Sequence, residues 1–155
     1  MRKPRQIKPN AIYHVTARAN RQEMILSSCI FKELFIDIMK SAKKKYHFRY
    51  HNFCIMNNHI HFIIEPLGKT NLSRIMQWIL SIFALKYNRL HDYHGHVWYD
   101  RFKSRILNNI FEYLNAYIYV INNPVAAGIV KLPTDFHYNG ISYISRKSME
   151  IFMPS

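Results

Sequence analysis

Long apolar runs, paired cysteines and acidic residues are all scarce in this chain of 155 residues. No hydrophobic stretch approaches the 18 or more residues of a membrane span, and the N-terminal MRKPRQIKPN lacks the apolar segment of a secretory signal. The two cysteines, Cys29 and Cys54, have no CxxC partner and lie in apolar periodic segments, which predicts reduced core residues and no disulfide framework. We therefore expect a soluble, cytoplasmic protein that does not bind a membrane.

The scarcity of acidic residues leaves a large positive excess. The chain has 22 Lys and Arg against 9 Asp and Glu, which gives a formal net charge of +13 and a pI near 9.9. A compact basic domain most often faces a polyanion, and nucleic acid is the commonest one. Because 49% of the residues are hydrophobic, the chain can bury a substantial core as a single domain, which excludes intrinsic disorder as its main description.

Hydrophobic periodicity predicts the element order β-α-β-β-α-β, followed by an extra helix. We expect strands at residues 11–19, 47–55, 59–65 and 99–107, and helices at 27–46, 71–89 and 111–122. This order is typical of an α+β, ferredoxin-like (RRM-like) sandwich, in which helices cover one face of a four-stranded antiparallel sheet. Residues 1–10 are expected to form a basic arm and residues 131–155 a C-terminal tail.

Two histidines flank Ile60 in the segment NNHIHFIIE. Side chains alternate between the faces of a strand, so His59 and His61 should project from the same side. Two neutral imidazoles at that spacing can bind one divalent cation. The alternative is a pair of half-buried sheet histidines that hydrogen-bond to their neighbours.

Tyr119 and Asn123 are four residues apart and share a helix face if the last helix reaches Asn123, although Pro124 disfavours a helical residue before it. Asn123 offers a carbonyl oxygen suited to Mg²⁺ or Mn²⁺, and Tyr119 offers a hydroxyl that can attack phosphorus. The alternative is that Tyr113, Tyr117 and Tyr119 are packing aromatics. A rival metal site is the loop HDYHGH, whose His91, His94 and His96 have a spacing that can hold zinc.

Four segments together resemble the single-tyrosine HUH transposases, and among them the REP-associated tyrosine transposases and their insertion-sequence relatives. In chain order, they are YHVTARANRQ, FCIMNNHIHFIIEP, HVWYDRFKSRIL and YVINNPVAAGIV. The resemblance implies that residues 11–130 form the catalytic domain, that His59, His61 and Asn123 ligate Mg²⁺ or Mn²⁺, and that Tyr119 is the nucleophile, with Tyr117 as the nearby competitor.

The resemblance also implies an activity. It is that of a single-stranded DNA endonuclease and strand transferase, which forms a 5′-phosphotyrosine on hairpin or palindromic DNA during transposition in a bacterial cell. Such a protein is expected in the cytoplasm, on the nucleoid when bound to DNA, as a monomer or a homodimer. The alternative is a non-catalytic, RRM-like nucleic-acid-binding module.

The chain departs from the family pattern in two places. The segment after Pro133, TDFHYNGISYI, lacks the tryptophan-serine-serine pattern common near the end of relatives, and Asn57 stands where proline is frequent. The second difference is expected to affect only the turn.

Five basic residues are candidates for holding DNA. Three of them alternate along the expected fourth strand and two follow the first strand; they are Arg101, Lys103, Arg105, Arg18 and Arg21. Phosphate contacts from such residues should weaken steeply as salt rises. The alternative is a solvated basic face.

Overall fold

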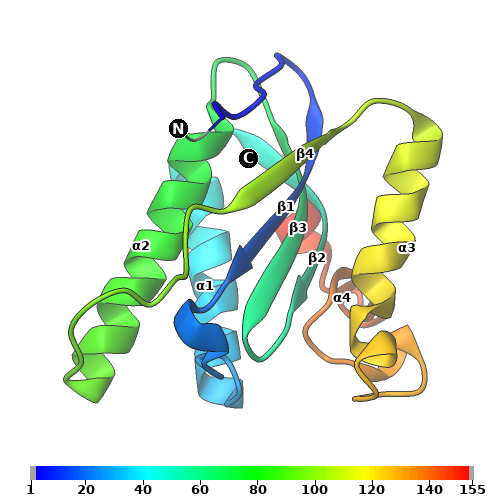
Figure 1. Cartoon of the computed structure of the whole chain (residues 1–155). Helices are drawn as coiled ribbons and strands as arrows, with labels where there is room; N and C mark the ends of the chain where they lie inside the picture. The colour runs from blue at the N-terminus through cyan, green and yellow to red at the C-terminus, as the bar shows by residue number, and fades with distance from the viewer. Residues whose placement is uncertain (1–2, 154–155) are drawn as a thin grey trace.

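The computed structural model describes residues 3–153 and contains one four-stranded antiparallel sheet (Figure 1). The strands are β1 (Ile12–Arg18), β2 (Phe48–Ile55), β3 (His59–Pro66) and β4 (Lys103–Leu107), in the spatial order β2-β3-β1-β4. The helices are α1 (Cys29–Lys45), α2 (Leu72–His91), α3 (Ile110–Ala126) and α4 (Gly140–Ser145), with short 3₁₀ turns η1 (Asn20–Gln22), η2 (Pro133–Asp135) and η3 (Met149–Phe152). This order and topology confirm the ferredoxin-like α+β fold.

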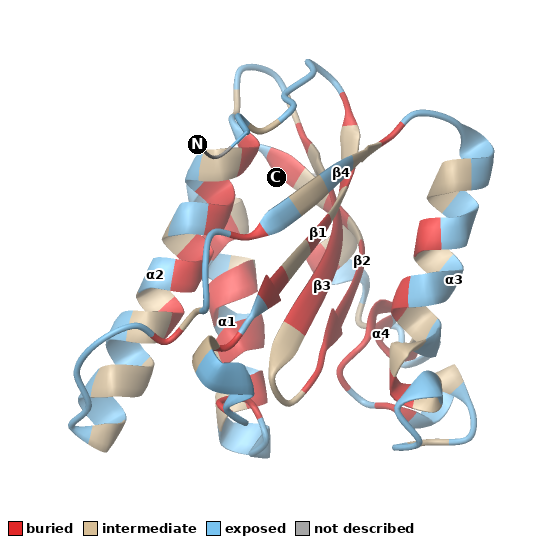
Figure 2. Cartoon of the chain, in the orientation of Figure 1, coloured by how far each residue is buried: buried red, intermediate tan, exposed pale blue. Residues whose placement is uncertain are grey.

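The two faces of the sheet are covered differently. Helices α1 and α2 lie together over one face of the sheet (Figure 2). The residues buried in this core include Val15, Phe35, Phe62 and Phe83. Helix α3 stands on the other side of the sheet, apart from α1 and α2 (Figure 1). Because β3 is sandwiched between these layers, residues 60–64 are all buried, in contrast to the half-exposed pattern of a one-sided sheet.

Side-chain caps begin the helices where the sequence turns from polar to periodic. Ser28 Oγ accepts a hydrogen bond from the Phe31 amide, and Asn109 Oδ1 accepts one from the Glu112 amide. Each cap satisfies a backbone donor that the first helical turn leaves free. The caps thus fix the starts of α1 and α3, and α3 is the helix that carries Tyr119 and Asn123.

The fourth strand begins later than expected, at Lys103. Tyr99 still pairs with β1 through its amide, which donates to the Arg18 carbonyl, but the Asp100 carboxylate then accepts from the Arg101 amide. Such local side-chain bonds compete with a sheet ladder. Arg101 therefore lies in a bend outside the strand, and the expected alternation of three cations holds only for Lys103 and Arg105.

The last helix is longer than expected and continues through Pro124 to Ala126. A proline ring near a helix end removes one hydrogen bond only, and the amides of Ala127 and Ile129 close the helix by donating to the carbonyls of Asn123 and Pro124. Tyr119 and Asn123 consequently lie on one continuous helix, one turn apart.

The expectation for the cysteines is half right. Cys54 is fully buried on β2, where burial raises the pKa of its thiol to about 12. Cys29 is exposed, at the first position of α1. Both thiols are free.

The C-terminal segment after α3 packs along the edge of β2. The Ile55 amide donates to the Tyr138 carbonyl at 2.9 Å, and Cys54 forms an isolated antiparallel bridge with Asn139. Aromatic and aliphatic side chains of this segment are buried, namely Phe136, Tyr138, Tyr143 and Ile151. Edge strand β2 is therefore covered within the same chain. Among residues 3–153, no helix is both long and apolar enough to cross a membrane.

Candidate active site

Three side chains from β3 and α3 form one polar cluster. Asn123 Oδ1 lies 3.2 Å from His59 Nε2, and Asn123 Nδ2 lies 3.2 Å from His61 Nε2. His59 is partly exposed, whereas His61 is 3% exposed. The two histidines project from the side of β3 opposite Ile60 and Phe62, so the strand alternation brings both imidazoles under α3.

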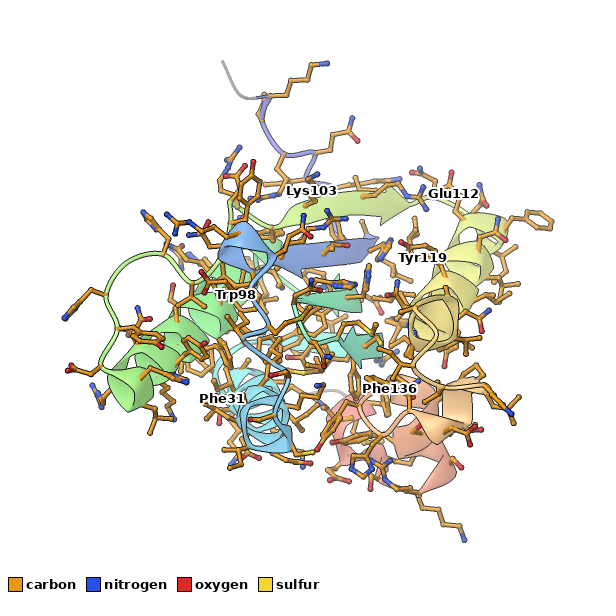
Figure 3. The ribbon with its side chains drawn as sticks, turned by 60° about the horizontal axis from the view of Figure 1, so that its bottom comes forward. Phe31, Trp98, Lys103, Glu112, Tyr119 and Phe136 are labelled. Carbon is orange, nitrogen blue, oxygen red and sulfur yellow. The ribbon has the colours of Figure 1, made fainter. Side chains whose placement is uncertain are left out.

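Tyr119 lies one helical turn before Asn123 and faces the same cluster. Its ring centroid is 5.5 Å from that of His61 and 5.8 Å from that of His14, in edge contacts. The side chain is 56% exposed, and Figure 3 shows it on the flank of α3 that faces the strands. The phenol is thus both next to the histidines and open to an incoming molecule.

His14 and Thr16 of β1 complete the surroundings of His61. His14 Nε2 lies 3.1 Å and Thr16 Oγ1 3.2 Å from His61 Nδ1, and the rings of His14 and His61 stack at 5.3 Å. The sequence reasoning assigned neither residue to the site. The alternation of His14 and Thr16 puts both on one face of β1, but their contact with His61 depends on the register Thr16↔His61, which local pattern does not predict.

Hydrogen bonds set the tautomer of each imidazole. His59 Nδ1–H donates to Asn58 Oδ1 at 2.7 Å, which leaves a lone pair on Nε2. Asn123 Nδ2–H donates to the Nε2 lone pair of His61, so His61 carries its proton on Nδ1 and donates it to His14 or Thr16. Both histidines therefore direct an Nε2 lone pair toward Asn123, in the tautomer that metal ligation requires.

The turn before His59 is held by a buried lysine. Lys32 Nζ donates to Asn57 Oδ1 at 2.7 Å and to the Leu26 carbonyl at 2.5 Å. The Asn58 carbonyl accepts from the Ala19 amide at 2.9 Å. Asn57, which stands where relatives often have proline, thus gives the turn a side-chain anchor, and this anchor orients Asn58 toward His59.

Burial keeps the three imidazoles neutral. Burial first, and then the neighbouring His59, His14 and Arg18, lower the pKa of His61 to about 3. Burial also lowers the pKa of His59, against a smaller raising effect of the Asn123 amide oxygen, which stabilises the protonated ring. Burial together with Arg105 lowers the pKa of His14. At neutral pH these nitrogens are unprotonated and free to bind a cation.

The donor set fits a divalent cation. His59 Nε2 and Asn123 Oδ1 lie 3.2 Å apart, and each points a lone pair at the other with no proton between them. A cation bound by both atoms would remove this lone-pair repulsion. Neighbouring ligands of an octahedral ion with bonds of 2.0–2.1 Å are about 3.0 Å apart, close to the observed spacing. Two imidazole nitrogens and one amide oxygen are all groups that can ligate a divalent cation.

The basic residues gather around two neighbouring cavities beside this cluster. Arg18, Lys103 and Arg105 lie on the same sheet face as the histidines, because they pair with His59, Thr16 and His14 respectively. A cavity of about 440 Å³ is lined by Lys103, Arg105 and Tyr119, and one of about 490 Å³ by Arg18, Arg21, Arg101 and Lys103. Each of the five candidates thus lines one of the two neighbouring cavities, and Lys103 lines both.

The loop histidines do not form a comparable site. The ring of His91 lies 4.2 Å from that of Tyr87 and 5.0 Å from that of Tyr93, and its Nδ1–H donates to the Tyr87 carbonyl. Within residues 3–153, no group of three His, Cys, Asp or Glu side chains is arranged to hold a metal ion. His91 is therefore part of an aromatic stack, and the structure offers no support for zinc at this loop.

Tyr117 is turned away from the histidines. Its half-buried ring packs against Tyr113 at 6.1 Å, and its carbonyl accepts from Asn52 Nδ2 at 3.4 Å. Six residues separate it from Asn123, which places it on another side of α3. Of the two tyrosines, only Tyr119 contacts the polar cluster.

Comparison with known proteins found a family model that matches this chain and solved structures that share its fold. Residues 7–122 match the family described as "Transposase IS200 like". The chain is similar to a solved REP-associated tyrosine transposase bound to a REP hairpin, with a TM-score of 0.78 and 19% identity over 100% of this chain and 92% of that one. It is also similar to a Deinococcus radiodurans R1 protein described as a transposase, with a TM-score of 0.54 and 12% identity over 76% of this chain and 95% of that one. No curated protein matches it in sequence.

Proposed function

Because the chain belongs to the IS200-like transposase family, a class of enzymes that cut and rejoin DNA, we propose that it acts on single-stranded or hairpin DNA through a covalent link to Tyr119. The observation that carries the proposal is an exposed phenol in contact with the His61 ring, in a cavity that Lys103 and Arg105 also line. The solved relative bound to a REP hairpin supports hairpin DNA as the substrate class.

His59, His61 and Asn123 are the residues that would hold a divalent cation, Mg²⁺ or Mn²⁺. The family is generally metal-dependent. When bound, the ion supplies positive charge that polarises a non-bridging phosphate oxygen. The protein's part is to keep both imidazoles neutral and oriented, through burial and through the hydrogen bonds that His59 donates to Asn58 and His61 to Thr16 or His14.

The chemical step is a substitution at phosphorus by the tyrosine oxygen. The bond between Tyr119 Oη and phosphorus forms as the bond from phosphorus to the 3′-oxygen breaks, which leaves a 5′-phosphotyrosine and a 3′-hydroxyl. The phenolic proton passes to solvent, to which the side chain is open, and the leaving 3′-oxygen takes up a proton. Since the covalent link retains a phosphate ester, a second 3′-hydroxyl can reverse the step and rejoin DNA without ATP.

The exposed cations position the strand for this step. Lys103 and Arg105, beside Tyr119, are placed to bind the phosphates that flank the reacting one, and Arg18, Arg21 and Arg101 to bind the next nucleotides. These contacts supply affinity without base recognition, so binding should fall steeply with salt. Orientation of the phosphate against a fixed phenol is a large part of such catalysis.

The test is formation of a covalent adduct. Wild-type protein is incubated with labelled, hairpin-bearing single-stranded DNA and Mn²⁺ or Mg²⁺, and products are separated on a denaturing gel. We expect an adduct with the wild type and with Tyr117→Phe, the matched control, and none with Tyr119→Phe. An equal yield from Tyr119→Phe would contradict the assigned nucleophile. Hairpin binding without any adduct, on several substrates, would favour a non-catalytic binding module.

A further inference from the structure

A second polar network ties α3 to the sheet, away from the histidine pair. His51 Nε2–H donates to Glu65 Oε2 at 2.8 Å, and His51 Nδ1 accepts from the Tyr113 hydroxyl at 2.9 Å. Glu65 and His51 come from β3 and β2, and Tyr113 comes from the first half of α3. The carboxylate, imidazole and phenol are mostly buried and each has a partner, so the network is complete as it stands.

This network is distinct from the reaction site. Glu65 follows His59 by six strand residues, about 20 Å along β3, and Tyr113 precedes Tyr119 by about 9 Å along the helix axis. Tyr113 is also a poor nucleophile, because burial and the neighbouring Tyr117 and Glu65 raise the pKa of its hydroxyl. The network therefore has another role than chemistry at phosphorus.

Helix α3 has little apolar contact to hold it in place. Its fully buried residues are Ala116, Val120 and Pro124, a narrow stripe beside which only the half-buried rings of Tyr113 and Tyr117 pack on the core, whereas α1 buries six residues. Polar contacts join α3 to the sheet at three positions along the helix. They are the hydrogen bonds from the Tyr113 hydroxyl to His51 and from Asn52 to the Tyr117 carbonyl, and the contacts of Asn123 with His59 and His61. With so small an apolar interface, hydrogen bonds carry an unusual share of the docking of this helix.

Resting on the proposed function, we propose that Glu65, His51 and Tyr113 are positioning residues that set where α3 lies on the sheet and thereby where Tyr119 meets the phosphate. Tyr119 and Asn123 are on one rigid helix, so the tie at Tyr113 constrains both together. A shift of about 1 Å in the position of an attacking group such as the Tyr119 hydroxyl is enough to lower the rate of the chemical step strongly. The chain of hydrogen bonds from Tyr113 through His51 to Glu65 links α3 to β2 and β3 at once. It therefore fixes both the distance of α3 from the sheet and the rotation of the helix about its axis.

The test compares Tyr113→Phe with Tyr117→Phe, a matched loss of a hydroxyl one turn away that leaves the network intact. The first readout is amide hydrogen exchange of the protein without DNA or metal. We expect the amides of residues 116–126 to exchange about fivefold faster in Tyr113→Phe, the effect of losing one hydrogen bond, while amides of α2 and those of the Tyr117→Phe protein keep the wild-type rate.

The second readout is the rate of adduct formation against hairpin concentration. Tyr113→Phe should lower the maximal rate about fivefold or more with the half-saturating concentration unchanged, because the DNA-binding cations are untouched. Glu65→Gln keeps an acceptor for His51 Nε2–H and should stay close to the wild type, whereas Glu65→Ala should behave like Tyr113→Phe. This contrast separates the tie from a general loss of packing.

Each outcome bears on the proposal. Exchange and rate in Tyr113→Phe that equal those of Tyr117→Phe overturn it, as does a Glu65→Ala protein with a wild-type rate. If the wild type forms no adduct but exchange in α3 rises in Tyr113→Phe, the proposed function has failed and the helix tie stands. If adduct forms and exchange is unchanged, the function stands and the tie is refuted.

Discussion

Buried His61 should make the protein lose stability as pH falls below neutrality. In the folded chain the pKa of His61 is about 3, and in the unfolded chain it takes the ordinary value near 6.5. Above pH 6.5 both states carry a neutral imidazole. Below it the unfolded state binds a proton that the folded state does not, so the free energy of unfolding decreases until pH reaches about 3.

The size of the effect follows from the gap between the two values. Each pH unit inside the window removes about 1.4 kcal/mol, so at pH 4 the loss from His61 alone is roughly 3 kcal/mol. Domains of this size have a total stability of roughly 5–15 kcal/mol. His14 and His59, whose pKa values are also lowered, act in the same direction. We therefore expect marked destabilisation between pH 6.5 and 4.

Urea unfolding measures this directly, at pH 7, 6, 5 and 4, constant ionic strength and with a chelator present. The informative comparison is His61→Gln, which keeps a buried polar group but cannot take up a proton. Its stability should decline less than that of the wild type by roughly 3 kcal/mol between pH 7 and 4. His94→Gln, which removes an exposed loop histidine, should follow the wild type. Parallel curves for the wild type and His61→Gln would refute the reasoning.

Three further predictions concern the tail, the thiols and the basic face. Gly140→Ala should lower the free energy of unfolding by about 1–3 kcal/mol, because the added Cβ would overlap Asn52 Oδ1. Thermal melting should show that the same change costs much less in an Asn52→Ala background, and an equal loss there would point to another cause. Cys29 should react with iodoacetamide in the native protein while Cys54 reacts only after unfolding, as mass spectrometry of the alkylated peptides would show, and native labelling of Cys54 would contradict its burial. Arg105→Ala should weaken hairpin binding about equally for different sequences and reduce the slope of log affinity against log salt by about 1; an unchanged slope would exclude a phosphate contact.

Local pattern was sufficient to predict the parts of the site that lie on one element. Alternation in a strand puts His59 and His61 on one face, and a separation of four puts Tyr119 and Asn123 on one side of a helix, as the structure has them. The element order also predicted the sheet correctly, because the pattern of apolar residues changes period at each boundary.

Neighbours across strands could not be predicted in the same way. His14 reaches His61 only through the register of β1 on β3, and His51 joins Glu65 and Tyr113 at an irregularity in the pairing of β2 with β3. A shift of one residue in either register would turn these side chains to the other face. The alternation of charge predicts Arg101 on a strand, but the Asp100 carboxylate accepts from the Arg101 amide and interrupts the strand there.

The +13 charge and the neutral candidate site depend on each other. Arg18 and Arg105 face the histidines and help to lower the pKa of His61 and His14, which keeps their lone pairs free of protons. The same positive field opposes a divalent cation, so a site of two imidazoles and one amide, with no carboxylate in it, should bind a metal weakly by itself. A phosphate beside Lys103 and Arg105 would offset that field and add oxygen ligands of its own. Metal and DNA should therefore strengthen each other's binding by the same factor, and in the proposed reaction the cation would be held tightly only where there is a phosphate to act on.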